Sequence, residues 1–310
     1  MKRVNEKRSN SILKTELLKS FTILALSLLT FSCSKDDNAA VEVVNNATSL
    51  ELVSGDNQSG LKETTLVTPV EFIVKNQEGS PFSGATVTFS VLEGSVSTQT
   101  SISDSGGKAV VNWTLGASLG SQTLLITVFK DDGVTPLAGS PMVVTATALR
   151  PIILGEFHEG GVVFFVDDSK LHGLVCTSRF IGDFVWGCPG TEINGADDLE
   201  IGGGQQNTLD IINGCNQTPI AARACDELVL LGFSDWFLPS KLELNQIAIN
   251  RSLISATSTS NGGNALTGAY WCSSEFSQNT ALRRTIDGIA VSFSVVGKDA
   301  AAHVRAVRAF

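Results

Sequence analysis

The sequence is short of several residue types, and each shortage excludes a class of protein. Its 310 residues include one tyrosine, two methionines and three histidines. Charged residues make up 17% of the chain and the net charge is −9, so the basic surface that a nucleic-acid-binding protein needs is missing. The histidines are scattered and no two cysteines are spaced as Cys-x-x-Cys, so we predict no metal site and no cofactor.

The residue types that are abundant favour β-structure. Hydrophobic residues reach 43%, which is enough to build cores and excludes a chain that is mainly disordered. The 29 glycines favour strands joined by turns over a bundle of long helices. A length of 310 residues indicates about two domains.

The N-terminal apolar run, residues 21–31, follows a basic segment and is too short to cross a membrane, which takes about 20 residues. This arrangement predicts a secretory signal peptide over residues 1–32. The run ends at Ser32-Cys33, which resembles the lipobox of bacterial lipoproteins in a relaxed form that Bacteroidetes-type lipoproteins use. The resemblance implies that Cys33 becomes the first residue of the mature chain and is acylated.

The segment after Cys33 predicts a location. Four residues resemble the export signal that sends such lipoproteins to the outer face of the outer membrane: Ser34, Lys35, Asp36 and Asp37. Residues 33–46 are polar and predict a lipidated tether. Residues 1–32 carry a net charge of +4, so the mature chain has a formal charge of −13 and is anchored to the membrane by lipid, not by charge.

Residues 47–150 alternate apolar and polar side chains, as β-strands do. The runs that show this alternation are 66–74, 85–91, 109–114 and 122–128. Short strands with glycine-containing turns between them, and no cysteine, predict one β-sandwich without a disulfide.

Three stretches of this sandwich carry a resemblance to a known family. They are SGDNQSG (54–60), VKNQEGSPFSGATVTFSV (74–91) and DSGGKAVVNWTLGASLGSQTLLITV (104–128). They resemble bacterial Ig-like domains of the invasin/intimin type. The resemblance implies a stalk that holds a distal domain away from the cell surface.

Residues 155–310 differ in composition, since they hold all five cysteines after Cys33 and three of the four tryptophans. Two apolar runs predict a hairpin, and a glycine-rich loop follows at 201–206. Ser240 and Glu243 have the spacing of a capping box, which predicts the start of a short helix over 242–249. The other predicted elements are a helix over 220–231 and strands over 269–273, 289–295 and 303–310. This part is therefore predicted to be α+β.

Three motifs in this second part carry another resemblance: GFSDWFLPSKLEL (232–244), YWCSSE (270–275) and VRAVR (304–308). Together they resemble the C-terminal domain of the Legionella collagen-like adhesin, a family related to the C-type-lectin-like fold. The fold class implied is an all-β Ig-like sandwich followed by an α+β C-type-lectin-like domain. The calcium-binding motifs of sugar-binding C-type lectins are missing, so no calcium site is predicted.

The cysteines of this part predict one disulfide. Cys188 and Cys215 bracket the glycine-rich loop, and a bridge between them would fix a long segment that has few core residues. The sequence leaves open whether Cys225 is a buried thiol or is bonded to Cys272, and Cys176 has no assigned partner.

Aromatic and basic residues supply the candidates for ligand binding. Trp186, Trp236 and Trp271 could stack on sugar rings, although such side chains more often belong to a core. Arg305 and Arg308 are three residues apart on a strand and would face opposite sides. One would pair with Glu243 or Glu275 and the other would meet an anionic ligand, whereas Asp235 would bond to nearby backbone.

The order of anchor, tether, stalk and head favours a non-catalytic adhesion protein that binds a glycan or a host or matrix protein. A structural envelope component without a small ligand is the first alternative. The second is a cysteine-dependent, oxidase-like enzyme on the same fold, for which Cys225 and Cys272 would be the reactive pair. These three hypotheses differ in what they require of the thiols and of the exposed surface.

Overall fold

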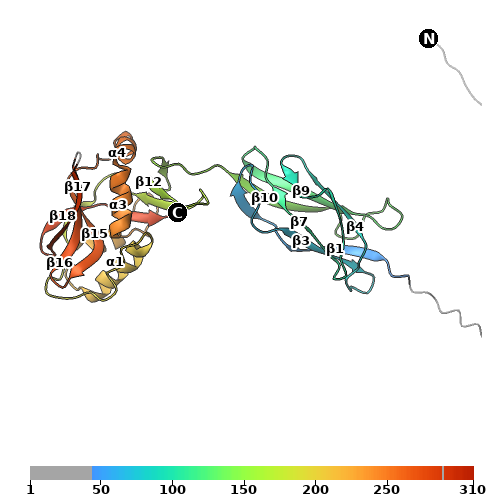
Figure 1. The fold of residues 1–310 in the computed structure, drawn as a ribbon, viewed down its shortest axis with the longest axis horizontal. Helices are drawn as coiled ribbons and strands as arrows, with labels where there is room; N and C mark the ends of the chain where they lie inside the picture. The colour runs from blue at the N-terminus through green and yellow to red at the C-terminus, as the bar shows by residue number, and fades with distance from the viewer. Residues whose placement is uncertain (1–43, 288–289) are drawn as a thin grey trace, which may run out of the picture. The chain divides into compact units, whose positions relative to one another are not determined.

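The computed structural model describes residues 44–287 and 290–310 (Figure 1). The predicted signal peptide, the lipidation site Cys33 and the export signal lie outside the described residues and stay predictions. Among the residues that are described, no helix combines the length and the apolar character needed to cross a membrane.

The N-terminal sandwich, residues 47–149, consists of two main sheets around one core. The smaller sheet is antiparallel and has the strand order β1 (Ala47–Ser54), β3 (Val70–Asn76), β7 (Lys108–Val111). The larger has the order β2 (Gln58–Leu61), β10 (Met142–Leu149), β9 (Gly120–Val128), β4 (Thr86–Val91), β6 (Thr100–Ile102). Strands β5 (Ser95–Val96) and β8 (Trp113–Thr114) form a further short pair.

The core of the sandwich follows from the two-residue period of its strands. Phe72 of β3 and Ile126 of β9 are buried members of the same cluster, because alternate side chains of both sheets point inward. The four predicted runs overlap β3, β4, β7, β8 and β9. Strands β1, β2 and β10 were not predicted, since Ala146 and Ala148 give β10 only a weak apolar signal and β2 contains a glycine.

The C-terminal region, residues 155–310, has two more sheets. The first is antiparallel, with the order β11 (Phe157–His158), β12 (Gly161–Val166), β13 (Gly173–Cys176), β19 (Val307–Ala309). The second has the order β14 (Gly182–Val185), β18 (Ala301–Val304), β15 (Ala269–Ser277), β16 (Thr280–Asp287), β17 (Ala290–Gly297). The predicted hairpin is confirmed, because β12 and β13 pair as antiparallel neighbours.

Four helices complete this region: α1 (Gly203–Gly214), α2 (Ala221–Asp226), α3 (Lys241–Ile249) and α4 (Arg251–Ser260). Helix α3 contacts β12, β15 and β16, and α1 contacts α2 and β15. The predicted capping box is confirmed, since the Ser240 hydroxyl accepts from the Glu243 N–H and the Glu243 carboxylate accepts from the Ser240 N–H.

Two predicted elements were wrong. The expected glycine-rich loop is the beginning of α1, because Gly203 and Gly204 serve close packing there; a Cβ on Gly204 would lie 2.3 Å from a Glu243 carboxylate oxygen. The helix expected over 220–231 ends at Asp226, and the rest of the predicted helix is replaced by a segment that leads into a turn at Leu231 and Gly232, which have positive φ angles of 53° and 88°.

Helix α4 and strand β16 were not predicted. Within α4 only Ile254 and Ser258 are buried, so its sequence has no continuous apolar stripe. Strand β16 contains two consecutive arginines, and Arg284 is nevertheless buried with its guanidinium 4.6 Å from the centre of the Phe293 ring. Stacking on an aromatic ring thus allows the Arg284 guanidinium to be buried, although the sequence pattern predicts an exposed position.

Candidate binding pocket

The three tryptophans proposed to stack on sugars are core residues, so that interpretation is corrected. Trp186, Trp236 and Trp271 are all buried, and each indole N–H donates to a backbone carbonyl. Trp186 donates to Cys272 at 3.0 Å, for example. A ring whose surface and polar edge are both used inside the protein has no face left for a ligand.

The two arginines are also buried, and neither pairs as predicted. Arg308 donates to the Asp235 carboxylate at 2.8 Å and to that of Glu159 at 3.2 Å. Its guanidinium lies 4.0 Å from the centre of the Phe233 ring. Asp235 therefore bonds to an arginine and not to local backbone. The charge of Arg308 is neutralised inside the chain and is not available to an anionic ligand.

Arg305 is held by uncharged groups. Its guanidinium donates to the carbonyls of Ser178 at 3.2 Å and Asn264 at 3.1 Å. The two predicted partners have other roles, since Glu243 caps helices and Glu275 pairs with the buried Lys298. The expectation that one arginine would pair with Glu243 or Glu275 was wrong, because the Glu243 carboxylate bonds to backbone N–H groups and the Glu275 carboxylate pairs with Lys298.

The structure joins Cys188 to Cys215, the pair assigned from the sequence. Cys225 and Cys272 are separate buried thiols, so the bridge left open between them is not formed, and Cys176 is a third buried thiol. Burial raises the pKa of the Cys272 thiol to about 12, against the opposing hydrogen bonds from Ser274, and burial also raises the pKa of Cys225. These thiols are protonated at neutral pH and are not activated.

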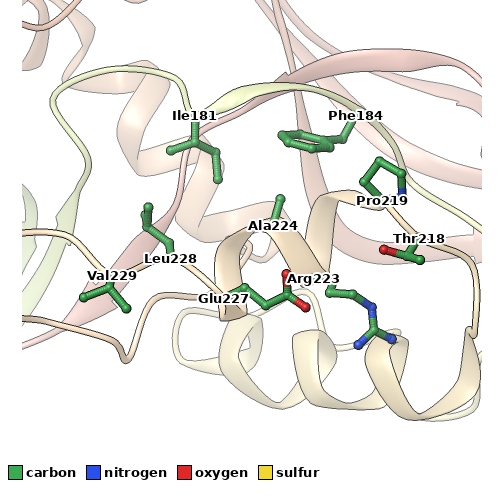
Figure 2. A pocket seen from close by; sticks show the side chains of 9 residues that line it. All are labelled: Ile181, Phe184, Thr218, Pro219, Arg223, Ala224, Glu227, Leu228 and Val229. Carbon is green, nitrogen blue, oxygen red and sulfur yellow. The ribbon is translucent and has the colours of Figure 1, made fainter.

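An open pocket of about 330 Å³ lies at the edge of the second C-terminal sheet (Figure 2). Strand β14 is the edge strand there, and the Ile181 N–H just before it donates to the Val304 carbonyl at 2.8 Å, which fixes that side of the pocket. Helix α2 and its flanking segments form the other side. The lining residues are Ile181, Phe184, Thr218, Pro219, Arg223, Ala224, Glu227, Leu228 and Val229.

The residues that line this pocket are mostly apolar, and one of these apolar residues is strongly exposed to solvent. Val229 exposes 71% of its surface, whereas Ile181, Phe184 and Leu228 are half-buried. Figure 2 shows Ile181 and Phe184 on one side with Ala224 of α2 facing them. A concave apolar surface with a few polar groups at its margin is the usual composition of a ligand site.

The two charged residues of the pocket, Arg223 and Glu227, differ in their interactions and in their exposure to solvent. The Arg223 guanidinium donates to the carbonyls of Ile212 and Cys215 at 3.4 and 3.3 Å, at the C-terminal end of α1. In Figure 2 it points away from Ile181 and Phe184. Glu227 is exposed, and no ion pair to it occurs within the described ranges. The charge that the pocket exposes is therefore the carboxylate of Glu227, whereas the guanidinium of Arg223 is directed at backbone carbonyls.

Sequence reasoning did not identify this pocket. Its residues come from two separated segments, 181–184 and 218–229, and form no motif. The one available signal was the run Leu228-Val229-Leu230-Leu231, which was assigned to the end of the helix predicted over 220–231. Within the described residues, no group of three or more His, Cys, Asp or Glu side chains could hold a metal ion.

The chain is similar in structure to parts of several solved proteins. No family model matches the chain, and no curated protein matches it. The D0-D1 domain of intimin is 22% identical over 34% of this chain and 49% of that one, with a TM-score of 0.25. Domains 4 and 5 of the S-layer protein SbsC are 20% identical over 34% and 53%, with a TM-score of 0.25.

A third solved structure is similar over more of the chain. A fimbrial protein from Bacteroides ovatus is 12% identical over 84% of this chain and 70% of that one, with a TM-score of 0.39. The chain spans about half the length of the first two structures. At these TM-scores no functional argument rests on the similarities.

Proposed function

We propose that this chain is a non-catalytic binding protein of the bacterial cell surface. In this proposal lipid on Cys33 anchors it in the outer membrane, facing outward, and an Ig-like sandwich serves as the stalk. The C-terminal region is a C-type-lectin-like head that presents a binding surface to glycan or protein ligands. The observation that carries the proposal is the open, mainly apolar pocket beside α2.

The enzyme alternative receives no support from the thiols it requires. A cysteine-dependent oxidase needs an accessible thiolate, whereas Cys225 and Cys272 are buried and burial raises the pKa of both. They are also separate thiols, not a bonded pair. Surface binding requires none of this chemistry, which is why we prefer it.

Binding of the mature chain tests the proposal. Residues 34–310, prepared without Cys33, are titrated against immobilised polysaccharides, mucin and extracellular-matrix proteins, with and without calcium and at two salt concentrations. We expect saturable binding to at least one of these ligands. Absence of binding to the whole panel, together with self-association of the chain, would instead indicate a structural envelope component.

A pair of matched variants locates the site. Val229→Asp places a charge in the pocket wall, and Val143→Asp makes the same change at a valine of the sandwich that exposes 56% of its surface. We expect the first to weaken binding about tenfold or more and the second to leave it unchanged. Equal effects of the two changes would contradict a site at this pocket.

A further inference from the structure

The segment that follows the pocket wall ends in a strained turn. The N–H of Leu230 donates to the carbonyl of Phe233 and the N–H of Phe233 to the carbonyl of Leu230, both at 3.0 Å. Leu231 and Gly232 between them both have positive φ angles. Such turns favour asparagine or glycine at the first central position, because a larger side chain is disfavoured in left-handed backbone.

Leu231 occupies that unfavourable position with its side chain in solvent. It exposes 68% of its surface, and Val229, two residues earlier, is the most exposed apolar wall of the pocket. A leucine that neither packs inside nor suits its backbone conformation contributes nothing evident to the fold. Leu231 follows the pocket residue Val229 by two positions, and we name Val229, Leu231 and the pocket together the apolar edge.

The charges at the apolar edge select among partners. Glu227 lines the pocket, is exposed and has no ion-pair partner within the ranges that the structure describes. The cation of Arg223 is directed at the carbonyls at the end of α1. The charge exposed at the rim is therefore the carboxylate of Glu227, on a chain whose net charge is −9. An acidic rim repels acidic partners and anionic lipid and favours a basic group.

We infer that the apolar edge binds a protein segment in which an apolar side chain stands next to a lysine or an arginine. The apolar side chain enters the pocket between Phe184 and Val229, and the basic one pairs with Glu227. Leu231 adds apolar contact at the outer end. This inference rests on the proposed function, because it names the ligand class of the same pocket.

A peptide-display selection tests this directly. The probe is a phage library of random dodecapeptides, selected on the immobilised mature chain and read by sequencing. We expect peptides with an apolar residue within two positions of lysine or arginine to be enriched about tenfold over the starting library. Lack of enrichment, or enrichment of acidic or uncharged peptides, overturns the inference.

Three variants and one control variant give readouts that general damage to the fold would not reproduce. Glu227→Lys should move the preference from basic to acidic peptides. Val229→Asp should abolish the enrichment, while Val143→Asp should give the same peptides as the wild type. Leu231→Asn should raise the melting temperature, because asparagine suits left-handed backbone, and should at the same time reduce the enrichment.

The outcomes separate this inference from the proposed function. Binding of the mature chain to a polysaccharide or matrix protein that survives both Val229→Asp and Glu227→Lys overturns the inference and leaves the surface-binding role intact. Binding to phosphatidylcholine vesicles that depends on Leu231 assigns the turn to lipid and also overturns it. Failure of the mature chain to bind the ligand panel and the library overturns both.

Discussion

The carboxylate of Glu243 accepts the backbone N–H of Gly202 at 2.8 Å, so a side chain at the start of α3 also caps α1. The same carboxylate accepts from the Ser240 N–H at 2.7 Å. The N-terminal N–H groups of a helix have no partner within it, and an acidic side chain both satisfies them and suits the helix dipole. One residue thereby fixes two helices against each other.

Replacing Gly204 tests how tightly this arrangement is packed. In Gly204→Ala the new Cβ would lie 2.3 Å from a Glu243 oxygen and 2.8 Å from the Ser240 nitrogen, so the helices must move apart. We expect a loss of about 1–3 kcal/mol in the free energy of unfolding, measured by urea denaturation. Gln205→Ala, at the exposed next position of α1, is the control and should change the free energy by less than about 0.5 kcal/mol.

The buried position of Glu243 predicts a pH dependence. Burial raises its pKa, although backbone N–H groups of Ser240, Gly202 and Gly204 act in the opposite direction. The folded chain then holds the proton more tightly than the unfolded chain, whose glutamate pKa is about 4.3. The stabilising contribution is complete below that pH and is lost as the pH rises through the pKa of the folded state.

Glu243→Gln removes this titration and provides the comparison. We expect the free energy of unfolding of the wild type, relative to that of Glu243→Gln, to fall as the pH is raised from about 4 towards neutrality. Urea denaturation of both proteins across this range measures the difference. A difference that is constant, or that grows with pH, would show that the N–H groups outweigh burial.

Lys298 and Glu275 form a buried ion pair whose loss should be costly. The Lys298 ammonium also donates to the Thr191 carbonyl at 2.7 Å, and the Glu275 carboxylate accepts from the Ile193 N–H at 2.9 Å. Lys298→Met leaves a buried carboxylate without its cation, so we expect a loss of about 3–5 kcal/mol by urea denaturation.

The double variant Lys298→Met, Glu275→Leu should lose much less than the sum of the two single changes, because neither charge is then left unpaired. Lys75→Met, which breaks the exposed pair between Lys75 and Glu51, should cost less than about 1 kcal/mol. Additive losses in the double variant would mean that the pair contributes through packing and not through charge.

The three free thiols should be unreactive in the folded protein. Cys176, Cys225 and Cys272 are buried, and burial raises the pKa of each thiol. We expect a thiol reagent at pH 8 to label none of them rapidly in native residues 34–310 and three per chain after unfolding in guanidinium. One rapidly labelled thiol in the native state would restore the enzyme hypothesis.

The sequence predicted those elements whose signals are local. The alternation around Phe72 and Ile126 marks strands because alternate side chains face one core, and the spacing of Ser240 and Glu243 marks a helix start because both groups act within one turn. Gly204 was misread, since its partner Glu243 is distant in sequence.

The candidate site depended on relationships that no local pattern contains. Arg308 looked available for a ligand, but Glu159, far away in the chain, and Asp235 neutralise it. The run containing Val229 and Leu231 was assigned to the end of a predicted helix, because a sequence shows that residues are apolar but not which of them are left in solvent.

The pairing of β13 with β19 sets an order of events during synthesis. Residues 173–176 have their second neighbour only when residues 307–309 have left the ribosome, more than a hundred residues later. Until then one side of β13 has unpaired N–H and C=O groups, the kind of edge on which strands of different chains associate. Nascent chains that lack residues 307–309 therefore need a chaperone to keep them from associating with one another. The first sheet of the C-terminal region is completed only in a late step.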